Sequence, residues 1–128
     1  MESVIDTSKR PLFGIEVEPT VTLSTLDQIF SAVEEELARH TSICILVNAV
    51  NTTSMELSHV RRIAEFGEKN DPLISAYIRA IAFVIPSAMV RGALKVAFQL
   101  RAPPHPIKIC KAHDEAEAFL QPFLANLF

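Results

Sequence analysis

Residues 43–47 read Ile-Cys-Ile-Leu-Val, a stretch without a single polar side chain. A run of this kind, rich in β-branched residues, is typical of a strand that is covered on both faces, as in parallel sheets with crossover helices. The run 80–85, Ala-Ile-Ala-Phe-Val-Ile, repeats the pattern. Each run is followed by a connection and then by apolar residues at helical spacing. We therefore expect a sheet whose buried strands alternate with helices.

Turn residues, helix caps and periodicity divide the rest of the chain into further elements. The order strand, strand, helix, strand, helix, strand, helix, strand, helix predicts one α/β domain with a mainly parallel sheet of four to five strands and about four helices. Residues 1–10 form an N-terminal tail or edge strand, and residues 11–128 form the domain. The expected strands cover 12–17, 20–23, 43–47, 80–85 and 106–110, and the expected helices cover 25–39, 54–68, the stretch from Ser87 to the prolines at 103–104, and the stretch from Asp114 onward.

Several local features follow from the same patterns. Thr53 and Glu56 have the spacing of a capping box, in which each side chain accepts a hydrogen bond from a free backbone N–H group at the start of a helix. The three glutamates at 34–36 are expected on a solvated helix face. Residues 73–77 are expected to form a short turn before the next strand.

Composition and charge exclude some classes of partner. A net charge of −3 and a pI near 5.8 provide no basic surface for nucleic acid or an anionic membrane. The apolar stretch 73–100 is interrupted by charged residues and Pro86, so stable membrane insertion is not expected. Because the chain starts without a basic segment followed by an apolar block, we expect a soluble, cytoplasmic protein. Cys44 and Cys110 are expected to be reduced thiols in the core.

The residues suggest no catalytic or cofactor site. The glycines do not form a phosphate-binding loop, and no pair of carboxylates follows a strand in a way that suggests acid and base roles. The four histidines lack the spacing of metal ligands and are expected to be solvated: His40, His59, His105 and His113. The sequence therefore predicts a protein without enzymatic activity, metal or cofactor.

Two segments carry a resemblance to a known family. The connection after the central strand reads Asn51-Thr52-Thr53-Ser54-Met55, and the C-terminal part runs from Arg91-Gly92-Ala93 in a helix, through a proline-flanked strand, to Ala118-Phe119-Leu120. With the order of elements, this resembles the STAS-like domains of the SpoIIAA-like group, from about Leu12 to Phe123. The resemblance implies the fold and a homodimer. In members of the anti-sigma-factor-antagonist type, a serine in an Asp-Ser-(Ser or Thr)-Gly-Leu tip is phosphorylated by a partner kinase. Thr52 occupies that position here, with Asn51 in place of the Asp and Ser54 in place of the Gly.

Two functions are therefore expected as alternatives. The first is a non-enzymatic regulatory or scaffolding module that binds a protein partner, with Asn51, Thr52, Thr53 and Ser54 as the phosphoacceptor or interaction tip. The apolar C-terminal segment 123–128 either folds back over the core or forms a dimer contact. The second is a carrier or sensor of a small apolar, lipid-like ligand, as in the related Sec14-like folds. Its pocket would be lined by Phe83, Met89 and Phe98.

Overall fold

The computed structural model describes residues 3–127 of the chain. Within these residues it contains a five-stranded sheet and five helices, so the expected α/β class with a mainly parallel sheet is confirmed. In chain order the elements are β1 (Val4–Asp6), β2 (Leu12–Glu16), α1 (Leu23–Leu37), β3 (Ile43–Asn48), α2 (Leu57–Lys69), α3 (Asp71–Tyr77), β4 (Ile78–Val84), α4 (Ala88–Leu100), β5 (Ile107–Cys110) and α5 (His113–Ala125).

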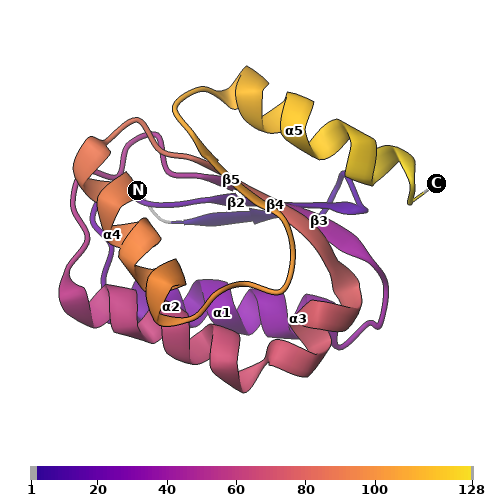
Figure 1. Ribbon diagram of the computed structural model, residues 1–128, viewed down its shortest axis with the longest axis horizontal. Helices are drawn as coiled ribbons and strands as arrows, with labels where there is room; N and C mark the ends of the chain where they lie inside the picture. Colours follow the sequence, from indigo (N-terminus) through magenta and orange to yellow (C-terminus); the bar gives the residue numbers. More distant parts are fainter. Residues whose placement is uncertain (1–2, 128) are drawn as a thin grey trace.

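The sheet follows the order of the chain, β1-β2-β3-β4-β5. β1 runs antiparallel to β2, and each later pair of neighbours is parallel. When successive parallel strands are added on one side and every crossover is right-handed, all the crossover helices fall on the same face of the sheet. Accordingly, α1, α2, α3 and α4 lie on one side of the sheet, while α5, which follows the last strand, lies on the other (Figure 1).

The central strand β3 explains the apolar run at 43–47, because its side chains alternate between two cores. Ile43 and Ile45 belong to the cluster that α1 and α3 cover. Cys44 belongs to the cluster on the opposite face, with Leu120 of α5. Both kinds of neighbour are apolar, so a strand in this place has no face on which a polar residue would meet water.

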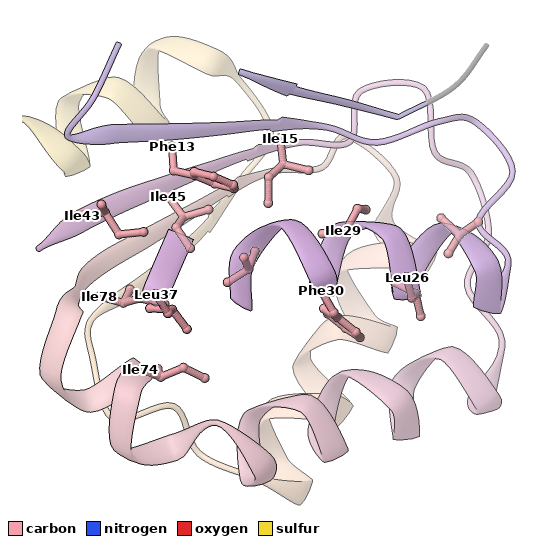
Figure 2. Packing of buried hydrophobic residues seen from close by; sticks show 12 residues of the cluster. Phe13, Ile15, Leu26, Ile29, Phe30, Leu37, Ile43, Ile45, Ile74 and Ile78 are labelled. Atoms are coloured by element: carbon pink, nitrogen blue, oxygen red, sulfur yellow. The ribbon is translucent and has the colours of Figure 1, made fainter. Parts of the chain in front are cut away.

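The larger core lies between the sheet and the helical layer, around α1 (Figure 2). Phe13 of β2 is paired in register with Ile45 of β3, and both point from the sheet toward the helices. On the far side of α1, the ring of Phe30 stacks on that of Phe66 from α2, with centroids 4.2 Å apart. The stacked rings join α1 and α2 into one helical layer.

The start of α2 differs from the prediction. The helix begins at Leu57, not at residue 54, and Thr53 is exposed. Instead, the ring of His59 accepts a hydrogen bond at Nδ1 from the backbone N–H of Glu56, at 3.1 Å. His59 is also buried, at 6% exposure, so the prediction of four solvated histidines is wrong at this position.

Residues 71–77 form the short helix α3, where a turn was expected. The sequence Asn70-Asp71-Pro72 does end α2, but proline also fits the first turn of a helix, where its missing N–H has no partner to lose. Residues 20–23, expected as a strand, instead lead into α1, with Thr22 as its N-cap.

One of the three glutamates at 34–36 is not on a solvated face. Glu36 is only 3% exposed, and its carboxylate accepts hydrogen bonds from Arg10 Nε and Nη2 at 3.0 and 2.8 Å. These hydrogen bonds hold the pKa of Glu36 below its usual value, against the opposing effect of burial. The ion pair fastens the turn between β1 and β2 to the end of α1.

The C-terminal segment folds back over the core. α5 continues through Pro122, and Phe123, Leu124 and Leu127 pack against the cluster that contains Cys44 and Cys110. Residue 128, the last of the apolar tail, lies outside the described residues. Both cysteines are buried and form no disulfide, as expected, and burial raises the pKa of the Cys44 thiol to about 11.

Candidate apolar binding site

An apolar cavity of about 180 Å³ lies between the sheet and the layer of helices α1 to α4. On the side of the sheet, the cavity is lined by Ile45 of β3 and by Ile81 and Phe83 of β4, among others. On the side of the helices, it is lined by Phe30 of α1, Ile63 of α2 and residues of α4. Ligand sites for small molecules are typically concave, mostly apolar and provided with few polar groups, and this cavity has that character.

Small residues on the helices leave the space open. Ala64 and Gly67 of α2 and Ala97 of α4 all line the cavity. A Cβ atom added at Gly67 would find no other atom within 4 Å. Because α2 and α4 present these short side chains inward, the helical layer does not fill the volume above the strands.

The structure places two of the three residues predicted for an apolar pocket in this cavity. Phe83 of β4 and Phe98 of α4 both line it, with ring centroids 5.7 Å apart. Met89 is 69% exposed and lies outside the lining. Val90 and Leu94 define the buried face of α4, and Met89 lies about 100° away from Val90 around the helix axis.

Polar side chains reach the cavity at its two ends. Thr52, in the connection after β3, is at the edge where the strands end; it is 1% exposed and its hydroxyl donates to the Glu18 carbonyl at 3.1 Å. Asp71, Arg101 and His105 lie at the opposite edge, where β4 and β5 begin. The sequence reasoning missed these three. Each adjoins a proline-marked end of an element, which is the one signal in the sequence that could have drawn attention to them.

An ion pair spans this second end of the cavity. Arg101 Nη2 lies 2.9 Å from Asp71 Oδ1, and the two side chains are 37% and 39% exposed. The pair joins the C-cap of α4 to the first residue of α3. Beside it, burial lowers the pKa of His105, because the charged imidazolium loses solvation; a backbone carbonyl near Nδ1 opposes this effect. His105 is therefore neutral at pH 7.

The predicted interaction tip is divided by the structure. Asn51, Thr53 and Ser54 are exposed, whereas Thr52 is buried. A kinase needs the hydroxyl of its substrate in its own active site, and the Thr52 hydroxyl faces the protein interior. The expected phosphoacceptor position is thus the one residue of the tip that solvent does not reach.

A second depression, of about 710 Å³, lies on the other face of the sheet between β1, β2 and α5. Its lining mixes apolar side chains with charged ones such as Lys9, Glu16 and Glu117. The predominantly apolar lining makes the cavity between the sheet and helices α1 to α4 the stronger candidate for a small-molecule site.

Other kinds of site have less support. Across residues 3–127, His, Cys, Asp and Glu side chains do not gather in any group of three that could hold a metal ion. None of the helices in this range combines the length and apolar character needed to cross a bilayer.

Comparisons with protein-family models, with curated proteins and with solved structures find no match to this chain.

Proposed function

We propose that this protein is a carrier or sensor of a small apolar ligand, which it holds in the cavity between the sheet and helices α1 to α4. The observation that carries the proposal is the cavity itself, about 180 Å³ in volume and lined almost entirely by apolar side chains. Apolar cavities of about 150 Å³ stay dry and bind molecules such as benzene. Transfer of an apolar molecule from water into this cavity is therefore favourable, because its apolar surface is removed from water.

The volume of the cavity limits the size of the apolar part of the ligand. At about 180 Å³, the cavity would hold about six to eight carbon atoms, by comparison with benzene in a cavity of about 150 Å³.

The proposal includes the STAS-like character of the domain. The order of the sheet, with one antiparallel edge strand and four parallel strands, is compatible with such a domain. In a ligand sensor of this fold, α2 and α4 would transmit occupancy, because both line the cavity and both reach the surface. A regulatory role toward a protein partner then follows from ligand binding and needs no phosphorylation of Thr52.

The experiment is to purify the protein from its own host, extract it with organic solvent and identify retained small molecules by mass spectrometry. Ala97 is 1% exposed and lines the cavity, so Ala97→Leu should fill the space. Val96→Leu, at an exposed neighbour on the same helix, is the matched control. We expect an apolar compound in the wild type and in the control, and little in Ala97→Leu. Equal amounts in all three proteins would refute the proposal.

A second candidate, a protein-binding surface, is favoured by exposed apolar residues at the edge where the strands end. Val50, Leu57 and Met89 are 49%, 59% and 69% exposed. They follow the adjacent strands β3 and β4, at the connection after β3 and at the first turns of α2 and α4. If a homodimer forms here, Leu57→Asp combined with Met89→Asp should convert it to a monomer in analytical ultracentrifugation. An unchanged dimer would exclude this surface.

A further inference from the structure

The polar groups of the cavity are unevenly distributed between its two ends, and this distribution indicates which headgroup the ligand has. At the Thr52 end, the one hydroxyl already donates to a backbone carbonyl. At the other end, the lining includes Arg101, which pairs with Asp71, and also His105. His105 is neutral at pH 7, so Arg101 is the one permanent positive charge among the cavity-lining residues.

Arg101 retains binding capacity despite its ion pair. A guanidinium group has five N–H donors, and the contact with Asp71 Oδ1 involves one nitrogen, Nη2. The pair is also more than a third exposed on each side, and ion pairs in such surroundings are weak. A ligand anion can therefore share Arg101 or displace Asp71 from it.

We propose that the ligand is an amphipathic monocarboxylate, whose alkyl or aryl portion fills the cavity and whose carboxylate binds Arg101 at the edge where β4 and β5 begin. This inference rests on the proposed function. The planar carboxylate matches the paired donors of a guanidinium group in two parallel hydrogen bonds. A phosphate headgroup, with a second negative charge, would meet only this single cation and the repelling carboxylate of Asp71.

The geometry assigns opposite roles to the two charged residues. Arg101 binds the headgroup, while Asp71 competes with it for the same guanidinium group. Removing Arg101 should abolish the preference for an acid over the corresponding alcohol. Removing the charge of Asp71 should increase the preference for the acid.

The test is isothermal titration calorimetry with octanoate and with 1-octanol, which share one alkyl chain and differ in the headgroup. We expect the wild type to bind octanoate about two- to fivefold more tightly than 1-octanol, because an ion pair with a partly exposed guanidinium group contributes modestly. Arg101→Met should remove that preference, so that the two probes bind with equal affinity. Asp71→Asn should increase the preference for octanoate over 1-octanol several-fold.

Arg62→Met is the matched control. Arg62 pairs with Asp27 at 2.8 Å and its side chain is 35% exposed, close to the values for Arg101, but it does not line the cavity. It should keep the wild-type preference. Equal affinity of the wild type for both probes, or equal loss of both in Arg101→Met, would overturn the headgroup assignment and leave the cavity proposal standing. Failure of both probes to bind the wild type would count against the cavity proposal as well.

Discussion

Filling the cavity from α4 should stabilise the protein. Ala97 is 1% exposed and lines the cavity, and leucine adds three carbon atoms at this position. At about 0.8 kcal/mol per buried methylene group, the gain is at most about 2.4 kcal/mol. Adjustment of neighbouring side chains to the larger residue should reduce it to about 1–2 kcal/mol. For a domain of this size, that corresponds to a rise in Tm of about 3–8 °C.

The control is Ala116→Leu. Ala116 is also a fully buried alanine on a helix, but it packs between α5 and the opposite face of the sheet and does not line the cavity. The same substitution there should overpack the core and cost about 1–3 kcal/mol. Urea denaturation followed by circular dichroism measures both free energies of unfolding. If Ala97→Leu is destabilised as much as Ala116→Leu, the volume beside Ala97 is not available and the reasoning from the cavity fails.

Three further perturbations test other parts of the structure. Thr52→Val should lower the free energy of unfolding by about 1 kcal/mol, because a hydrogen bond is lost. Thr52→Glu should lower it by about 3–5 kcal/mol, because the substitution buries an unpaired charge. A Thr52→Glu variant as stable as the wild type would show that this position is accessible to solvent. Glu36→Gln should lower the stability at pH 7 by about 1–3 kcal/mol, measured by urea denaturation against Glu35→Gln as the exposed control. The pKa of Glu36 is lowered in the folded state, so its contribution to stability is complete above the ordinary pKa of 4.5 and is lost as the pH falls through the folded pKa. The variant should therefore lose less stability than the wild type on acidification, and parallel pH profiles would contradict this. Cys44, with a thiol pKa of about 11, should react with iodoacetamide at pH 8 only after unfolding in denaturant, and rapid labelling of the folded protein would contradict its burial.

The strands could be predicted from the sequence because their environment is uniform. β3 places Ile45 in one core and Cys44 in the other, so each position demands an apolar residue whatever the details of packing. Phe83 of β4 could be selected for the same reason. Met89 could not be separated from Phe98, because α4 is apolar on more than one face and periodicity does not say which face turns toward the sheet.

The polar part of the site could not be predicted because distant segments build it. The buried hydroxyl of Thr52 donates a hydrogen bond to the carbonyl of Glu18, and the two residues are 34 positions apart in the sequence. Asp71, Arg101 and His105 come from α3, the end of α4 and the start of β5, and only the parallel order of the strands brings them to one edge. Contacts between such distant segments cannot be predicted from the local spacing of residues.

The central claim is that the cavity between the sheet and helices α1 to α4 accepts the apolar part of a small ligand. Intermolecular nuclear Overhauser effects between bound octanoate and the isotope-labelled protein would test it most directly. We predict that the terminal methyl group of octanoate shows contacts with Phe83 and Phe98, which line the cavity. Contacts confined to exposed residues such as Leu57 and Met89 would place the ligand on the surface and contradict the account.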